Sequence, residues 1–228
     1  MKKQVDKNGD ELVLEELDAK EQKTEGGKCI YDYEPKEIMA VHEPDLAYKI
    51  GDKTLEDYLA LPEGTRIELI DGVFYDMAAP TTVHSRIGIL LALQLQSFVN
   101  LNHGSCKPFV APTDVQLDMD DKTIVQPDVF LVCKKEQIHK ARIYGAPDLV
   151  VEIVSPSSWY MDMLKKKVKY EKAGVKEYWM IFPEEQKITV CWFEGEKKQM
   201  DYTFQDKVPV GIWNGKCEID FVEICENI

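Results

Sequence analysis

The spacing of apolar residues changes along the chain, and each change marks an expected element of secondary structure. Between Thr54 and Pro62 the sequence TLEDYLALP places apolar residues at helical spacing behind an N-capping threonine, which predicts a short helix. An extended run over residues 66–78 is interrupted by Asp71-Gly72, a dipeptide typical of hairpin turns. Residues 82–102 then repeat apolar side chains at a period of 3.6 residues. We therefore expect a hairpin followed by a long helix.

Three candidate strands come next, over residues 108–118, 124–133 and 148–156. The first two are expected to be antiparallel neighbours, because only a short turn around residues 118–122 separates them. The third, DLVVEIVSP, is almost wholly apolar apart from Glu152. Such a composition is typical of a central strand that other layers cover on both faces.

The rest of the chain predicts a second helix and further strands. Residues 158–173 look helical and end at Gly174, after which VKEYWMIFP and KITVCWFEG read as two strands. MDYTF, VPVGIW and CEIDFVEI predict additional C-terminal β hairpins. The expected fold is an α/β domain over residues 51–228, with a mixed β-sheet flanked by helices.

Residues 1–50 differ from this domain in composition. They hold 8 lysines against 13 aspartates and glutamates, which accounts for −5 of the net charge of −13, and their only helical-looking stretch is Leu12 to Gln22. We expect an acidic N-terminal extension that is mobile or loosely docked. The remaining −8 is spread over the domain and counts against broad electrostatic attraction to nucleic acid.

Composition also predicts where the protein resides. A hydrophobic content of 44% suits a globular protein, and no apolar run approaches the ~20 residues that a membrane span needs. The N-terminus lacks the apolar segment of a secretory signal, so we expect a cytoplasmic protein with no membrane partner. The six cysteines form no C-x-x-C pair, which predicts reduced and mostly buried thiols.

Two carboxylates stand out as candidate chemistry. Strand periodicity places Asp128 and Glu152 so that both can point to the same side of the sheet. An ionised carboxylate inside LVVEIV costs several kcal/mol to bury unless a cation or hydrogen bonds compensate it. A metal ion would compensate both groups, whereas Glu152 alone is equally compatible with a salt bridge to a lysine of the following helix.

That helix carries further polar candidates. Asp162, Lys166 and Tyr170 are spaced i, i+4, i+8 and share one face. A separate apolar stripe is expected from Met161, Leu164 and Val168. The spacing alone does not single out Lys166, because Lys165, Lys166, Lys167 and Lys169 form a run that is typical of a solvated helix face.

Together these groups suit phosphodiester hydrolysis. Two acidic groups on adjacent strands supply the hard oxygen ligands that Mg²⁺ or Mn²⁺ prefers, and the metal can generate hydroxide and stabilise developing charge. An ammonium group beside them can orient the nucleophile.

Several short motifs occur along the chain in the same order as in a known protein family. The chain resembles the Uma-two family of endonucleases, within the PD-(D/E)XK restriction-endonuclease-like superfamily, over about residues 53–193, on the stretches IELIDG, APTDV, QPDVFLV, GAPDLVVEIVSPSS and AGVKEYW together with His84 and the Asp162 to Tyr170 pattern.

This resemblance implies roles for particular residues. Asp128 and Glu152 match the motif acids and, with the backbone carbonyl of Ile153, would ligate the metal. The superfamily's usual lysine position is Val154 here, and a lysine from the following helix would replace it. Lys166 is the expected lysine and Lys169 the neighbouring alternative. The resemblance also implies a homodimer.

Further residues are candidate accessory groups, each with a structural alternative. His84 is expected near the metal or in a structural hydrogen bond at its helix start. Glu68 is an outer contributor or pins the hairpin, and Asp114 is an outer contributor or faces solvent. Ser155 and Ser157 look like caps of the helix that carries Lys166.

The function predicted from the sequence is a Mg²⁺-dependent endonuclease acting on phosphodiester bonds, with DNA as the expected partner. One alternative is a catalytically idle nuclease-fold module that binds a protein or nucleic acid. The other is a small-molecule phosphodiesterase, which suits the acidic composition because a short substrate needs no long basic track.

Overall fold

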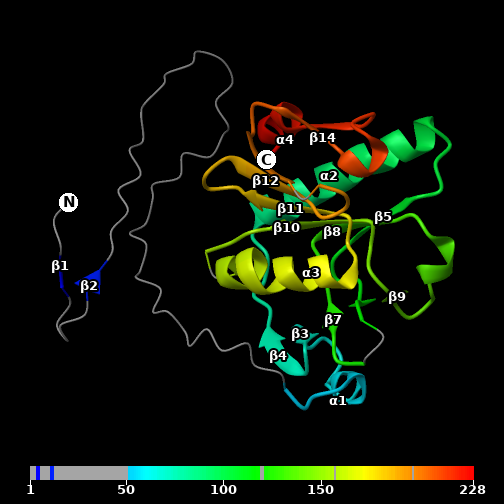
Figure 1. Cartoon of the computed structure of the whole chain (residues 1–228), viewed down its shortest axis with the longest axis vertical. Coiled ribbons are helices and arrows are strands. Elements are labelled where there is room, and N and C mark those ends of the chain that lie inside the picture. The colour runs from blue at the N-terminus through cyan, green and yellow to red at the C-terminus, as the bar shows by residue number, and fades with distance from the viewer. Residues whose placement is uncertain (1–3, 6–10, 13–50, 119–120, 157, 197) are drawn as a thin grey trace.

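A six-stranded mixed sheet divides the protein into two layers (Figure 1). Its strand order is β13-β12-β11-β10-β8-β5, in which β10 and β11 run parallel and the other neighbours antiparallel. The strands are β5 (Lys107–Val110), β8 (Val129–Val132), β10 (Leu149–Ile153), β11 (Glu177–Phe182), β12 (Lys187–Trp192) and β13 (Lys198–Thr203). As expected, the apolar strand β10 is central and wholly buried.

The structure, a computed structural model, describes residues 4–5, 11–12, 51–118, 121–156, 158–196 and 198–228. Two short strands, β1 (Gln4–Val5) and β2 (Glu11–Leu12), pair antiparallel. The rest of the N-terminal extension, including nearly all of the helix expected from Leu12 to Gln22, lies outside the described residues. Of the helices in the described ranges, none combines the length and apolar character needed to cross a membrane.

Helix α2 (Thr82–Leu101) covers one face of the sheet, together with the C-terminal segment (Figure 1). Thr81 caps the helix by accepting from the His84 N–H, and the buried stripe Ile87, Leu91, Leu95 packs on the sheet. The C-terminal segment comprises β14 (Lys207–Pro209), η3 (Gly211–Trp213), β15 (Glu218–Asp220) and α4 (Phe221–Glu226). The predicted C-terminal β structure is confirmed, but the prediction of a strand over residues 221–224 was wrong, because Asp220 caps a helix there.

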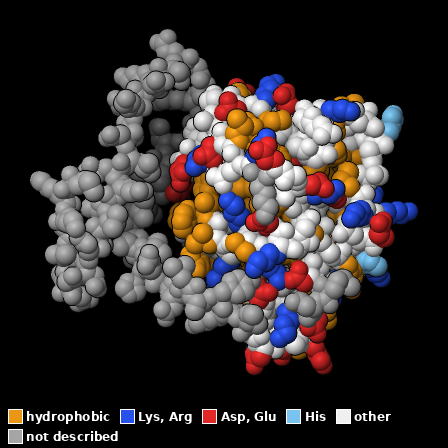
Figure 2. All heavy atoms as spheres, viewed as in Figure 1, with side chains coloured by type: hydrophobic (Ala, Val, Ile, Leu, Met, Phe, Trp, Pro, Cys, Tyr) orange, Lys and Arg blue, Asp and Glu red, His pale blue; other side chains and the backbone are white. Residues whose placement is uncertain are grey.

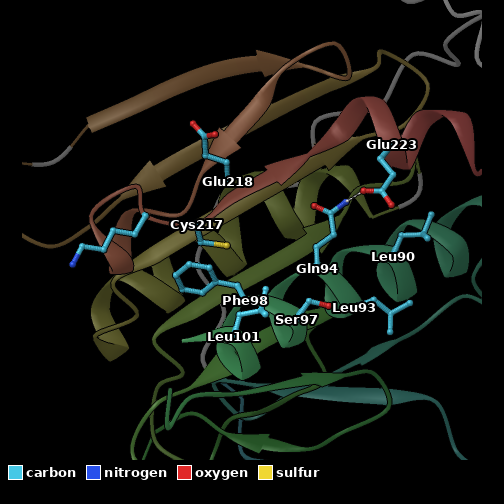
Figure 3. A pocket seen from close by; sticks show the side chains of 10 residues that line it. Leu90, Leu93, Gln94, Ser97, Phe98, Leu101, Cys217, Glu218 and Glu223 are labelled. Carbon is cyan, nitrogen blue, oxygen red and sulfur yellow. Dashed lines mark hydrogen bonds between the residues drawn. The ribbon is translucent and has the colours of Figure 1, made fainter. Parts of the chain in front are cut away.

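An open groove of about 420 Å³ lies between helix α2 and the C-terminal segment (Figure 3). Leu90, Leu93, Phe98 and Leu101 line its helical wall. Gln94 fastens the two walls, since its amide donates to the Asp220 carbonyl at 3.1 Å and accepts from the Asp220 N–H at 2.8 Å.

The opposite face of the sheet carries a helix and a second sheet. The helix begins with a π-helical turn, η2 (Met161–Lys166), and continues as α3 (Lys167–Ala173) to a left-handed Gly174. The second sheet has the order β4-β3-β7-β6-β9. Its elements and the short helices around it are α1 (Leu55–Leu59), β3 (Ile67–Ile70), β4 (Val73–Asp76), β6 (Val115–Gln116), β7 (Ile124–Val125), η1 (Lys135–Gln137) and β9 (Ile143–Tyr144).

Two predicted strands cross from one sheet to the other. Residues 108–118 divide into β5 and β6 around Pro112, and residues 124–133 divide into β7 and β8 around Pro127. Proline has no N–H for a ladder hydrogen bond, so each strand ends there and the chain changes sheets. The expected antiparallel pairing is confirmed in both halves, as β6 with β7 and β5 with β8.

The helix after Glu152 presents its polar side to the protein interior. Leu164 is 43% exposed and Val168 is 41% exposed, whereas Asp162 and Lys166 are buried. The predicted apolar stripe of Met161, Leu164 and Val168 does not form the buried face. The reason is that Glu152 and Glu68 line the surface under this helix and attract its lysine rather than its leucine.

Among the cysteines that the structure describes, the prediction of reduced thiols was wrong for three. Cys106 and Cys133 form a disulfide, and Cys225 is also disulfide-bonded, whereas Cys191 and Cys217 are free and buried. The β5–β8 register pairs Lys107 with Val132, which sets Cys106 directly opposite Cys133. Their separation of 27 residues hides this contact in the sequence.

Glu177 joins the main sheet to the C-terminal segment. Its side chain is buried at the start of β11, where it accepts from Trp179 Nε1 at 2.7 Å, Gly211 N at 3.0 Å and Ile212 N at 2.9 Å. Burial raises the pKa of Glu177, and these donors oppose the rise. The carboxylate therefore holds η3 in place.

We predict that Glu177→Ala lowers the free energy of unfolding by about 3 kcal/mol, because one buried donor and two partly buried donors lose their acceptor. Urea unfolding followed by tryptophan fluorescence measures the change. Glu196→Ala, at an exposed position with a surface salt bridge to Lys198, should change the free energy of unfolding by less than about 0.5 kcal/mol. Equal stability of wild type and Glu177→Ala would contradict the assigned role.

Candidate active site

The central strand brings one carboxylate, Glu152, into the interior. Its flanking residues in LVVEI are all buried, so the side chain reaches water on neither face. Glu152 Oε1 accepts a 2.6 Å hydrogen bond from the Tyr170 hydroxyl and lies 3.1 Å from Lys166 Nζ. The predicted contact between Glu152 and a lysine of the following helix is thus present.

Lys166 collects three carboxylates from three elements. Its Nζ lies 2.9 Å from Glu68 Oε2 on β3, 3.1 Å from Glu152 Oε1 on β10 and 3.7 Å from Asp162 Oδ1 one turn earlier. All four side chains are at most 7% exposed. Three carboxylates against one ammonium give this cluster, the Lys166 cluster, two more negative groups than positive ones when all are ionised.

Burial and this charge excess shift the titration of the cluster. Burial raises the pKa of Glu152 well above its usual range, and Lys166 only partly offsets the effect. Burial likewise raises the pKa of Asp162 to about 6. Burial alone would lower the pKa of Lys166, but Glu152, Glu68 and Asp162 outweigh it and hold that pKa well above its usual value. Lys166 therefore stays protonated at neutral pH.

Asp128 lies where the chain leaves β7 and enters β8. Its Oδ2 accepts from the Ile153 N–H at 2.8 Å and is 3.1 Å from His84 Nε2. The carboxylate thus takes a hydrogen bond from β10 next to Glu152 and contacts the first turn of α2. After burial, like-charge repulsion from Asp128 also contributes to the raised pKa of Glu152.

Of the accessory candidates Glu68 and Asp114, only Glu68 contacts the Lys166 cluster directly. Glu68 both pins and contacts the site, since its Oε1 accepts from the Gln126 N–H at 2.8 Å while Oε2 binds Lys166. Asp114 contacts neither Lys166 nor Glu68. Its Oδ1 accepts hydrogen bonds from the Tyr58 hydroxyl and from Gln126 Nε2, each at 2.9 Å. Asp114 therefore supports the Gln126 that supports Glu68.

The two candidate lysines have different partners. Lys169 Nζ binds Asp71 Oδ1 at 2.6 Å and also Asp118, so it fastens α3 to the second sheet rather than reaching Glu152. Sequence reasoning missed both aspartates as its partners. The IDG motif around Asp71 could have suggested one of them, since a turn aspartate next to a buried strand is well placed for a lysine.

The loop before η2 contains Ser155, one of the two serines expected to cap the helix. Ser155 N donates to Ser158 Oγ at 3.0 Å and Ser158 N donates to Ser155 Oγ at 3.2 Å. These two serines bond each other within the loop, but η2 follows Tyr160 with no side-chain cap, so the prediction that Ser155 caps this helix was wrong. Ser157 lies outside the described residues.

The Asp128 and Glu152 carboxylates are the candidate ligands of a metal ion. Within the described ranges, no three His, Cys, Asp or Glu side chains converge in a ready-made ligand set. The donor chemistry nevertheless suits a hard divalent cation, because Asp128 and Glu152 offer carboxylate oxygens and the Lys166 cluster has excess negative charge. The metal roles of Asp128, Glu152 and Ile153 remain predictions.

We predict that Asp162→Asn stabilises the protein at neutral pH and flattens its pH dependence. With a pKa of about 6 folded and 3.8 unfolded, Asp162 holds a proton in the folded state that the unfolded state has lost between these values. The free energy of unfolding of wild type should therefore fall as pH rises from about 4 to about 6, by at most about 3 kcal/mol from this group.

Urea unfolding of both proteins at several pH values measures this effect. Asp52→Asn, at an exposed position, is the matched control and should keep the wild-type slope. A steeper slope in Asp162→Asn, or a loss of stability at neutral pH, would contradict the assignment.

Comparisons with known proteins agree with this fold and arrangement. Residues 55–210, more than half of the chain, match the model of the Uma2 family, described as "Putative restriction endonuclease". A crystal structure of "a putative nuclease belonging to DUF820" from Anabaena variabilis is similar with a TM-score of 0.62 at 22% identity, over 76% of this chain and 99% of that chain. No curated protein matches. The structural likeness shows a shared fold, and the family match shows that the chain belongs to the Uma2 family.

Proposed function

We propose that the protein is a metal-dependent nuclease that hydrolyses phosphodiester bonds in DNA. The observation that carries the proposal is the excess of buried carboxylate around Lys166, with Asp128 as a fourth acidic group beside it. Burying several carboxylates with too few cations is costly, and a divalent ion relieves that cost. The family's description as restriction endonucleases supports the same reaction class.

In the proposed site the Asp128 and Glu152 carboxylates, with the Ile153 carbonyl, would hold Mg²⁺ or Mn²⁺. When bound, such an ion lowers the pKa of a water ligand and neutralises charge on the phosphate. Both groups belong to rigid elements: Glu152 to the central strand and Asp128 to the strand crossing, where the Ile153 N–H fixes its orientation. Little reorganisation is then needed at the moment of reaction.

Lys166 acts as a fixed cation in this proposal. A protonated ammonium cannot accept a proton, so its raised pKa excludes it as the general base at neutral pH. Glu68 and Asp162 hold its Nζ beside Glu152, where it can donate to the attacking water or to a phosphate oxygen. Tyr170 donates to Glu152 and supports the same carboxylate from α3.

His84 orients Asp128 through its 3.1 Å contact. The His84 side chain is 21% exposed and Asp128 17%, more than any member of the Lys166 cluster, so this pair marks the side from which substrate reaches the site. A homodimer also belongs to the proposal.

We predict that Glu152→Gln abolishes Mg²⁺-dependent cleavage while the fold is kept. The amide retains an acceptor for Tyr170 and Lys166 but loses the charge that holds a hard cation. Cleavage of plasmid, single-stranded DNA and RNA with Mg²⁺, Mn²⁺ or EDTA should fall by at least about a hundredfold. Glu136→Gln, at an exposed position, should cleave like wild type.

Thermal melts of the same variants separate this proposal from its rivals. Mg²⁺ should raise the melting temperature of wild type but not that of Glu152→Gln, and the metal-free variant should melt above metal-free wild type because one repelling carboxylate is gone. An idle module would show no Mg²⁺ shift and a destabilised variant. Cleavage of bis(p-nitrophenyl) phosphate but of no nucleic acid would identify a small-molecule phosphodiesterase instead.

A further inference from the structure

Lys165, the residue next to Lys166, projects to the outside of the site. Its Nζ donates to the Tyr75 hydroxyl at 2.7 Å and lies 4.6 Å from the centre of the Tyr75 ring and 5.8 Å from that of Tyr160. Lys165, Tyr75 and Tyr160 are all partly exposed. A lysine between two aromatic rings is thus held at the surface rather than extended into solvent.

The π-helical turn creates this arrangement. In an α-helix, residues five apart point about 140° away from each other, at ~100° per residue. In a π-helical turn the backbone hydrogen bond spans i to i+5, which brings such residues to one side. The turn at Met161–Lys166 therefore lets Lys165 approach Tyr160 while Lys166 and Asp162 point inward.

The β3–β4 hairpin places this exposed group beside the Lys166 cluster. Glu68 and Tyr75 are directly opposite in the antiparallel register, so their side chains lie next to each other on one face. Two consecutive lysines of η2 contact these neighbours: Lys166 binds Glu68 in the interior and Lys165 binds Tyr75 at the surface. The outer pair thus forms a rim of the proposed active site.

We infer that Lys165, Tyr75 and Tyr160, with the neighbouring Trp159, form a docking platform for single-stranded nucleic acid. This inference rests on the proposed nuclease function and names the form of substrate that the site takes. An ammonium has three donors, so its bond to Tyr75 leaves capacity for a phosphate oxygen. Trp159 is 44% exposed and Tyr160 is partly exposed, and aromatic side chains at a surface can stack with unpaired bases.

Charge decides between single-stranded and duplex substrate. Duplex binding depends on many Lys or Arg contacts to phosphates, but the net charge here is −13. On the face seen in Figure 2, basic and acidic side chains are interspersed rather than gathered into a basic track. With one lysine at the rim, affinity must come mainly from stacking, which requires bases that are not already stacked in a duplex.

The test is the affinity of the full chain for a dye-labelled oligothymidylate and for a duplex of equal length, measured by fluorescence anisotropy in EDTA so that no cleavage interferes. Wild type should bind the single strand more tightly than the duplex. Lys165→Met, Tyr160→Ala and Trp159→Ala should each weaken single-strand binding by about tenfold. Lys165→Arg should bind nearly as wild type does.

Lys167→Met is the matched control, because Lys167 Nζ binds Gln199 on β13 instead of the aromatic pair. It should keep wild-type affinity, and melting curves verify that every variant is folded. Equal affinity of Lys165→Met and Lys167→Met, duplex preferred over single strand, or no binding by wild type would each overturn the inference.

Cleavage assays run in parallel keep the two proposals distinct. Mg²⁺-dependent cleavage with unchanged binding in Lys165→Met would overturn the platform and leave the nuclease standing. Lys165-dependent binding without cleavage by wild type under any metal would support the platform as a binding site and overturn the nuclease function.

Discussion

The shared ammonium of Lys166 is the interaction on which both the packing and the proposed chemistry depend. It joins β3 of the second sheet, β10 of the main sheet and η2 between them, through Glu68, Glu152 and Asp162. Removing the lysine would leave three buried carboxylates without their cation, a cost of several kcal/mol. The charge that remains uncompensated is also what suits the site to a divalent ion. Lys166 therefore serves both the packing of the fold and the proposed catalysis.

The crossing of the chain between two sheets creates the position of Asp128. At Pro127 the chain leaves β7, and Asp128 then accepts the Ile153 N–H with its side chain. A backbone carbonyl would fill this place in an uninterrupted ladder. The interruption therefore gives the site a carboxylate at the end of a buried strand, held by a hydrogen bond that also stabilises β10. His84 reaches the same carboxylate from α2, so two elements, β10 and α2, fix one side chain.

The helix after Glu152 shows how a charged surface can outweigh amphipathic patterning. Burying Asp162 and Lys166 leaves Leu164 and Val168 exposed, which forfeits some apolar burial. Ion pairs with Glu68 and Glu152, together with the Tyr170 hydrogen bond, offset that loss. The same π-helical turn directs Lys165 outward toward Tyr75 and Tyr160. The π-helical turn thus places Lys166 in the interior and Lys165 at the surface.

The sequence by itself determined most of the elements and singled out Glu152 as a residue of the candidate site. Capping at Thr54, the Asp71-Gly72 turn and the apolar run around Glu152 are local signals, because each depends on residues a few positions apart. Glu152 could be singled out because a carboxylate in a fully apolar strand needs a partner wherever that strand lies. The choice of Lys166 over Lys169 agreed with the structure through helical spacing and the family resemblance together.

Tertiary structure decided what depends on distant residues meeting. The division of two strands between two sheets, the Cys106–Cys133 disulfide and the contacts of Lys169 with Asp71 and Asp118 join segments far apart in sequence. Hydrophobic periodicity also does not reveal which face of the η2–α3 helix is buried. That choice depends on the carboxylates of β3 and β10, which lie far away in sequence. Periodicity records the preference of a segment for apolar surroundings, whereas burial depends on the free energy of the assembled neighbours, and here the buried charges outweighed the leucine and valine.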